Sequence, residues 1–282
     1  MLSLIICSRT PRISKELEKN IAETIGCEYE LVVIDNSKNK YSIFSAYNEG
    51  VRRAQGDNLC FMHDDISFKT TDWGTKVEKM LEDESIGIVG VIGSYIMTKD
   101  YGYWDMMAPY ITGFVMGEKD GVVANDGDAY NDYTGGEGNV VILDGMWLCC
   151  SKRIFDKICF DEQTYMGFHM YDMDICMQSL VAGYKNMIVR DIVMQHYCQP
   201  KYDRIFIENI EKFHKKWMEY LPIHRSVSLS PRTLKKLDSD VKRLFGSIAA
   251  NVSLSESAAY RTGCILLKPI YFLKKMINKL YK

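Results

Sequence analysis

Residues 58–66 read Asn58-Leu59-Cys60-Phe61-Met62-His63-Asp64-Asp65-Ile66, an apolar run followed directly by an acidic turn. The apolar part predicts a buried strand that ends at Met62. Beyond it, two carboxylates beside a histidine offer the oxygen and nitrogen donors that a divalent cation takes. Paired aspartates are also common in solvated turns, so the pair alone leaves both interpretations open. Its position after a buried strand favours the metal site.

Strand and helix patterns alternate on both sides of this segment. Apolar or β-branched runs predict strands at 2–7, 31–34, 58–62 and 86–92. Helices are predicted at 14–25, where Ser14 is the expected cap, and at 44–54, 73–81 and 152–157. This order predicts an α/β fold with a mostly parallel sheet flanked by helices. Ligands of such sheets lie at the carboxyl ends of the strands. Those ends here carry Ser8-Arg9, Asp35 and Asp64-Asp65.

The second acidic pair is Asp172 and Asp174. A helix predicted at 175–182 makes Asp174 its N-cap and places Asp172 just before its first turn. Asp172 is then either a general base, kept ionised by the helix N-terminus, or a surface charge. Asp144, which precedes Gly145, is by default a turn residue. His196 follows a strand-like piece at 192–195 and, like His169, is either structural or a ligand.

The segment 93–139 differs from its surroundings because it is rich in Gly, Tyr, Asp and Asn, with a polar stretch from Gly117 to Asn139. A connection of that length without regular structure is usually functional or disordered. Its aromatic side chains could offer ring faces to a ligand, or the segment could be a surface loop without a binding role. These side chains are Tyr101, Tyr103, Trp104, Tyr110, Tyr130 and Tyr133.

Charge divides the chain into two parts. Residues 225–282 carry a net charge of +9, whereas residues 1–224 carry −11. We therefore predict one domain at 1–224 and a basic, mostly helical extension at 225–282. Apolar and lysine side chains interleave between Ile265 and Leu280, so residues 260–282 could lie on an anionic membrane surface or pack as a helix on protein.

Nine cysteines without CxxC spacing argue against a structural zinc site and fit a reducing compartment. The short apolar start, 1–7, lacks a basic region before it, so it does not predict a signal peptide. The apolar stretch 264–276 is too short and too charged to span a bilayer. We expect a cytoplasmic protein without a nucleic-acid partner. The segment 260–282 would allow it to lie peripherally on the inner face of the membrane.

The order of these motifs resembles the GT-A fold glycosyltransferases, specifically family-2-like bacterial enzymes that build surface polysaccharides. The resemblance covers residues 2 to about 200. It implies that 1–224 is the catalytic domain and that 93–139 is an insertion on the acceptor side, whose aromatic rings could contact the acceptor sugar. It rests on segments that occur in the same order: Leu2–Arg9, Val32–Ser37, Tyr47-Asn48-Glu49-Gly50 with Ala54–Asp57, Phe61–Asp65, Leu143-Asp144-Gly145, Phe160-Asp161-Glu162, Phe168–Asp174 and His196.

The resemblance implies a role for each matching position. Asp35 would contact the nucleotide base, with Ser8 and Arg9 nearby, and Asn48 and Asp144 would also belong to the donor site. Asp65 would bind the metal directly, completed by His196, and Asp64 would contact the ribose or the metal. Asp172 would be the catalytic base of an inverting reaction. Two positions depart from the family pattern: His63 stands where many relatives have Asp, and Tyr171 replaces an acidic residue.

The predicted reaction moves a sugar from a UDP- or GDP-linked donor to a hydroxyl of a glycan or lipid-linked acceptor, assisted by Mn²⁺ or Mg²⁺ as a Lewis acid. Two other functions remain open. One is a non-catalytic sugar-nucleotide-binding protein of the same fold. The other is a metal-dependent nucleotidyltransferase, but residues 7–12 lack the glycine-rich phosphate loop usual in that class.

Overall fold

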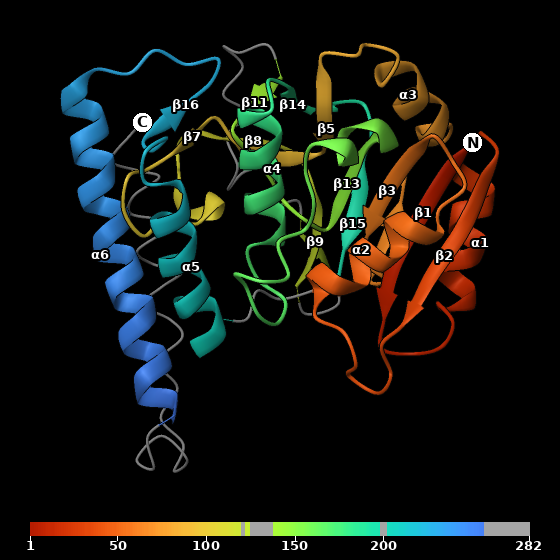
Figure 1. The fold of residues 1–282 in the computed structure, drawn as a ribbon, viewed down its shortest axis with the longest axis horizontal. Helices are drawn as coiled ribbons and strands as arrows, with labels where there is room; N and C mark the ends of the chain where they lie inside the picture. The colour runs from red at the N-terminus through yellow and green to blue at the C-terminus, as the bar shows by residue number, and fades with distance from the viewer. Residues whose placement is uncertain (120–121, 125–137, 198–201, 257–282) are drawn as a thin grey trace.

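The computed structural model describes residues 1–119, 122–124, 138–197 and 202–256 (Figure 1). Its strands are β1 (Leu2–Ser8), β2 (Tyr29–Asp35), β3 (Asn58–Met62), β4 (Ile66–Phe68), β5 (Ile86–Gly90), β6 (Ile92–Ser94), β7 (Ile96–Met97), β8 (Ile111–Gly113), β9 (Met116–Lys119), β10 (Val122–Ala124), β11 (Asn139–Val140), β12 (Ile142–Leu143), β13 (Trp147–Ser151), β14 (Lys185–Ile188), β15 (Met194–His196) and β16 (Ile223–His224). Its α-helices are α1 (Lys15–Thr24), α2 (Ile43–Arg53), α3 (Trp73–Met80), α4 (Tyr171–Val181), α5 (Arg204–Trp217) and α6 (Pro231–Glu256).

A seven-stranded sheet forms the centre of the molecule, in the order β11-β14-β5-β13-β3-β1-β2. β1 pairs in parallel with β2 and β3, and β14 pairs in parallel with β5. Helices flank the sheet, as Figure 1 shows for α1 and α2 beside β1 and β2. The prediction of a mostly parallel α/β sheet is confirmed. β13 is an addition that periodicity did not reveal: it lies antiparallel between β3 and β5.

Close packing holds the first strands against their helices. Every residue of β1 except Cys7 is buried, as expected for a strand covered on both faces. Gly50 of α2 lies so close to β1 that an added Cβ would be 2.2 Å from Cγ2 of Ile5. α1 begins as predicted, because Ser14 accepts a hydrogen bond from the Leu17 amide. The Gly50 contact holds α2 against β1, the strand whose end carries the predicted donor-binding residue Ser8.

The second half of the chain differs from its predicted elements in three places. Residues 152–157 form a short 3₁₀ helix, Lys152–Asp156, rather than an α-helix. α4 begins at Tyr171, four residues earlier than predicted. The segment 93–139 is not structureless, because its described part contains β6 to β10 and the 3₁₀ helix Trp104–Met106. Tyr130 and Tyr133 lie outside the described residues.

The C-terminal helices pack against each other on the side of the molecule away from α1 (Figure 1). α6 buries a stripe at helical spacing: Leu237, Val241, Leu244 and Ile248. Phe245 stacks on Tyr101 with 5.0 Å between ring centroids, so the extension docks on the 93–139 segment. The predicted amphipathic piece at 260–282 lies outside the described residues, and the boundary at residue 224 stays a prediction.

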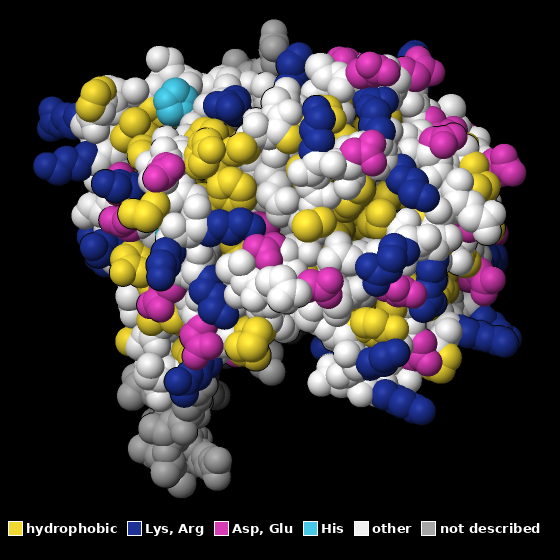
Figure 2. All heavy atoms as spheres, in the orientation of Figure 1, with side chains coloured by type: hydrophobic (Ala, Val, Ile, Leu, Met, Phe, Trp, Pro, Cys, Tyr) yellow, Lys and Arg dark blue, Asp and Glu magenta, His cyan; other side chains and the backbone are white. Residues whose placement is uncertain are grey.

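No helix in the described part of the chain combines the length and the apolar character needed to cross a membrane. On the face drawn in Figure 2, acidic and basic side chains are interspersed among apolar ones. This face therefore carries no broad basic surface of the kind that tracks a phosphate backbone.

Candidate metal and donor site

Two strand pairings bring together residues that are 133 positions apart. β3 ends at Met62, and the amide of His63 then donates to the carbonyl of Met146. β4 follows at once and pairs antiparallel with β15, opposing His196 to Ile66. Asp65, the residue before Ile66, accepts at its carbonyl from the Tyr197 amide. The sheet register therefore sets His196 beside Asp65.

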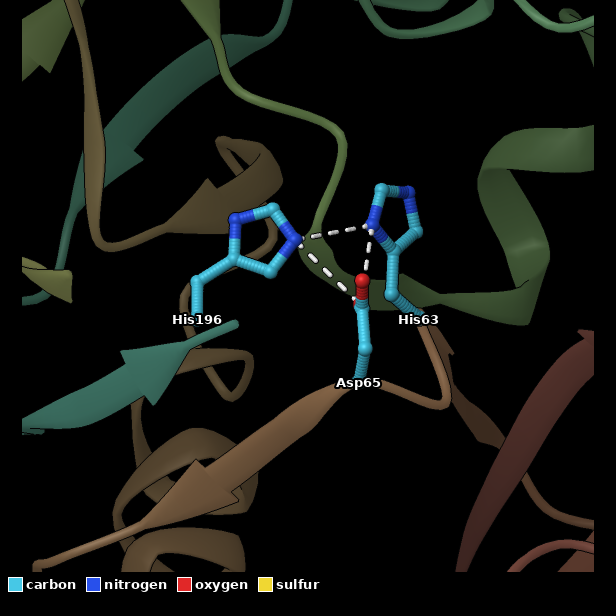
Figure 3. Close-up of side chains that lie close together, drawn as sticks. All are labelled: His63, Asp65 and His196. Atoms are coloured by element: carbon cyan, nitrogen blue, oxygen red, sulfur yellow. Dashed lines mark hydrogen bonds and ion pairs between the residues drawn. The ribbon is translucent and has the colours of Figure 1, made fainter. Parts of the chain in front are cut away.

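His63, Asp65 and His196 converge on one point (Figure 3). Nε2 of His196 lies 3.3 Å from Oδ1 of Asp65 and 3.3 Å from Nδ1 of His63. Nδ1 of His63 lies 3.7 Å from the same carboxylate oxygen. The structure thus unites Asp65 and His196, the two predicted metal ligands, and adds His63, whose part was open.

The three side chains shift one another's ionisation. Burial, followed by the proximity of His196, lowers the pKa of His63 to about 4, so this ring is neutral at pH 7. Burial opposes ionisation of Asp65, but His196 and then His63 hold its pKa below the usual value. Burial also acts to lower the pKa of His196, yet Asp65 and then Asp144 raise it overall. An ionised carboxylate therefore faces two imidazoles.

One atom of this cluster lacks a satisfactory partner. Oδ1 of Asp65 is buried, and no described residue offers it a well-aligned hydrogen bond despite the nearby ring nitrogens. A buried carboxylate oxygen without a donor costs free energy unless a cation or another group compensates it. The donor set of two imidazole nitrogens and one carboxylate oxygen suits a divalent metal. These residues fit the metal that the sequence predicted.

Tyr171 supports the cluster, and sequence reasoning gave it no role. Its hydroxyl lies 2.7 Å from Nε2 of His63, in hydrogen-bonding distance. The ring is buried at the start of α4, edge-on to Tyr47 at 5.5 Å between centroids. The signal was present in the sequence, because His63 and Tyr171 are the two positions that depart from the family pattern.

The predicted donor residues lie along the same edge of the sheet. Ser8 and Asp35 oppose each other at the ends of β1 and β2. The hydroxyl of Ser8 donates to Oδ2 of Asp64 at 2.7 Å, so one carboxylate of the acidic pair faces β1 and the other faces His196. Asp35 and Arg9 are exposed there, and the Ser37 hydroxyl and amide lower the pKa of Asp35.

A cleft of about 240 Å³ adjoins this edge. It lies between the start of α1 and the segment that follows β3, and it includes both Asp64 and Asp65. Its other lining residues are Ser14, Glu16, Leu17, Ile66, Ser67 and Tyr197. Ligand pockets for drug-sized molecules are usually somewhat larger, so the cleft has room for part of a donor.

Asn48 makes a structural contact that the sequence did not predict, whereas Asp144 makes the turn contact that it did predict. The amide of Asn48 donates to the carbonyl of Phe160 at 2.8 Å and accepts from its N–H at 3.1 Å, tying α2 to that loop. Asp144 accepts from the Met146 amide at 2.8 Å, the turn contact expected by default, and burial raises its pKa. A donor contact of either residue stays a prediction.

Asp172 differs from its predicted environment. It lies inside the first turn of α4, only 3% exposed, and not ahead of the helix. The helix N-terminus was expected to keep it readily ionised, but burial and then the nearby Asp144 raise its pKa to about 7. Its carboxylate still accepts from the amides of Met173 and Gly145, at 2.9 and 3.2 Å. Desolvation therefore outweighs the helix terminus.

The N-cap prediction for Asp174 is wrong, because α4 starts at Tyr171 and Met170 occupies the cap position. The Asp174 carboxylate is buried and accepts from Nε1 of Trp217 at 2.8 Å and from Nζ of Lys216. It joins α4 to α5. His169 is also outside the cluster, with Nε2 3.9 Å from Asp203.

Residues 3–220 match the model of a glycosyltransferase-like family. The chain belongs to this family. The match spans all the residues described above, from Ser8 to His196, and makes the protein a transferase of the family-2-like type. The sequence matches no functionally curated protein at a significant level.

Solved structures agree with this glycosyltransferase assignment at the level of the fold. The mannosyltransferase PcManGT from Pyrobaculum calidifontis, in complex with GDP-Man and Mn²⁺, aligns with a TM-score of 0.52 and 13% identity, over 99% of this chain and 79% of that one. Residues 1–349 of S. aureus TarS in complex with UDP align with a TM-score of 0.53 and 13% identity, over 92% and 76%. At these identities the likeness establishes the GT-A fold alone.

Proposed function

We propose that this protein is an inverting glycosyltransferase that transfers a sugar from a UDP- or GDP-linked donor to a hydroxyl of a glycan or lipid-linked acceptor. The observation that carries the proposal is the convergence of His63, Asp65 and His196 at the strand edge that also holds Ser8 and Asp64. PcManGT and TarS, of the same fold, are complexed with GDP-Man and with UDP, and PcManGT also with Mn²⁺. Surface polysaccharide synthesis in a bacterium is the setting that the family resemblance suggests.

The donor side follows from the geometry of that edge. Asp65 and His196 would hold Mn²⁺ or Mg²⁺, which as a Lewis acid would neutralise charge on the departing nucleoside diphosphate. Asp35 would contact the base, with Ser8, Arg9 and Asp64 along the path to the ribose. The cleft that includes Asp64 and Asp65 would take the part of the donor nearest the metal.

Asp172 is the proposed base. A pKa near 7 makes its carboxylate a far better proton acceptor than an ordinary aspartate, while leaving much of it ionised at neutral pH. The acceptor hydroxyl has only a small exposed edge of this side chain to approach. Removal of the hydroxyl proton assists attack on the anomeric carbon from the face opposite the leaving nucleotide, which inverts the configuration.

Three aromatic rings that could have contacted the acceptor pack within the protein instead. Trp104 and Tyr110 are buried, and Tyr101 stacks on Phe245, so these three rings of the 93–139 segment are committed to packing. Phe168 is 48% exposed, and its ring centroid lies 5.4 Å from that of His63. An aromatic face beside the reaction centre suits the apolar C–H face of a sugar ring.

The backbone around Phe168 is rigidly held. Asn209 of α5 is fully buried and donates to the carbonyls of Met166 and His169, at 2.7 and 3.2 Å. The carbonyl of Gly167 accepts from the amide at the start of α2, at 3.1 Å. Asn209 thus fixes the loop from which the Phe168 ring projects. An exposed aromatic ring on a backbone held in this way favours a binding role for Phe168.

The decisive experiment measures metal-dependent hydrolysis of UDP- and GDP-sugars without acceptor. Release of free sugar from one donor, abolished by EDTA, supports the transferase and names the donor. Binding without turnover supports a non-catalytic protein, and release of pyrophosphate from a nucleoside triphosphate with a sugar phosphate supports a nucleotidyltransferase. The anomeric configuration of the transfer product then tests inversion.

Membrane association is proposed for residues 260–282 through their lysines and interleaved apolar side chains. Truncation at residue 256 tests it better than truncation at 224, because loss of α6 would uncover the protein surface on which its apolar stripe packs, including Tyr101. The full chain should float with liposomes that contain anionic lipid, and the 1–256 chain should not. Equal flotation of the two would point to a helix that contacts protein instead.

A further inference from the structure

The hydrogen bond between His63 and Tyr171 links the two positions that depart from the family pattern. It joins Nε2 of His63 to the Tyr171 hydroxyl at 2.7 Å, while Nδ1 of the same ring faces Asp65 and His196. A neutral imidazole carries one N–H and one lone pair. When Nε2–H donates to Tyr171, the lone pair lies on Nδ1, the nitrogen that faces the cluster.

The surroundings keep the tyrosine hydroxyl in this place. Tyr171 is buried in the first turn of α4 and packs against Tyr47 and Phe44. Gly145 leaves room for it, because a Cβ at that position would lie 2.3 Å from the Tyr171 hydroxyl oxygen. The ring therefore cannot move far without disturbing both the Gly145 turn and α4.

We propose that His63 is a third protein ligand of the metal, that Tyr171 is the positioning residue that orients its Nδ1, and that the resulting site binds transition-metal cations in preference to Mg²⁺. The ligand atoms, two ring nitrogens and one carboxylate oxygen, all lie within 4.8 Å of one another. Mg²⁺ takes oxygen ligands and gives up water reluctantly, whereas imidazole favours Mn²⁺, Co²⁺ and later metals in rising order. An aspartate at position 63 would have given the site an oxygen in place of one nitrogen.

The inference rests on the proposed metal site and not on the transfer reaction. Its test therefore uses the full chain with metal salts alone. Titration calorimetry with CoCl₂, MnCl₂ and MgCl₂ in the absence of nucleotide gives the affinities. We expect Co²⁺ to bind more tightly than Mn²⁺, and Mn²⁺ at least roughly tenfold more tightly than Mg²⁺. The visible absorption of bound Co²⁺ reports the ligand set independently of activity.

Variants separate ligation from folding. His63→Ala should abolish or strongly weaken Co²⁺ binding, and Tyr171→Phe should weaken it by about 10–100-fold and alter the Co²⁺ spectrum. His169→Asn and Tyr165→Phe are matched controls, because these side chains contact Asp203 and Asp174 instead of the cluster. Both controls should keep the wild-type affinity and spectrum, with circular dichroism confirming the fold of every variant.

Three results would overturn the proposal. One is Mg²⁺ binding as tightly as Co²⁺. Another is an unchanged Co²⁺ affinity and spectrum in His63→Ala or in Tyr171→Phe. The third is the failure of every metal to bind at millimolar concentration. If the proposed transfer reaction failed while these affinities held, the donor hydrolysis assay alone would be negative, so the two failures are distinguishable.

Discussion

Replacement of Asp172 by Asn should make the protein more stable at high pH while removing its activity. The folded-state pKa of Asp172 is about 7, against an ordinary value of 3.8. Between these values the folded protein holds a proton that the unfolded chain has released. The carboxyl group therefore destabilises the fold increasingly as pH rises, until it is ionised in both states above pH 7.

The magnitude follows from the two pKa values. The protonation linkage disfavours folding by about 2 kcal/mol at pH 5 and about 4 kcal/mol at pH 8, at about 1.4 kcal/mol per pKa unit. Asn cannot ionise, but it leaves one of the amides of Met173 and Gly145 without an acceptor. That cost does not change with pH. The stability of Asp172→Asn relative to wild type should therefore rise by about 2–3 kcal/mol between pH 5 and pH 8.

Urea unfolding of both proteins at several pH values, in EDTA, measures this difference without a contribution from metal binding. Other titrating groups are shared by the two proteins and largely cancel. In the transfer assay, the variant should lose about 10²–10⁴-fold in kcat. For wild type, kcat/KM should rise with pH up to about 7, because the base must be unprotonated. A stability difference that is flat with pH would refute the raised pKa, and normal turnover in the variant would remove the base assignment.

Three further outcomes are expected. Asp65→Asn should abolish metal-dependent donor hydrolysis while His169→Asn retains it; comparable rates in the two would contradict the metal site. Phe168→Ala should raise the KM for the glycan acceptor severalfold and leave acceptor-free hydrolysis unchanged, and Phe168→Tyr should restore the KM; an equal loss in both assays would mean that the ring only supports the fold. Asp174→Asn should lower the free energy of unfolding by about 2 kcal/mol or more, because Lys216 keeps only Asp161 as an ionic partner and the new amide N–H₂ would face donors that now reach the carboxylate; unchanged urea unfolding would show that this carboxylate does not stabilise the fold.

The sequence was most informative where local pattern and burial agree. Continuous apolar runs predicted β1 and β3, and the Ser14 cap predicted the start of α1. β13 was not predicted as a strand. An apolar run indicates burial, but it shows neither whether the segment is a strand nor in which direction a strand would run. The start of α4 was predicted too late along the chain. Its first residues, Tyr171 and Asp172, are buried by tertiary contacts, which the periodicity of the sequence does not reveal.

The geometry of the metal and donor site could be predicted from local sequence patterns even less than the fold. Asp65 and His196 could be named from the order of motifs, but only the pairing of β4 with β15 sets their atoms 3.3 Å apart. The desolvation of Asp172 depends on how the chain packs around α4, which local sequence patterns do not show. The helix N-terminus alone therefore predicted a readily ionised carboxylate, whereas burial raises its pKa.

Taken singly, His63 and Tyr171 each depart from the family pattern. Their side chains meet at 2.7 Å, so the two departures form one arrangement, in which the second orients the first. Two residues 108 positions apart, each a departure from the family pattern, therefore support one metal site together.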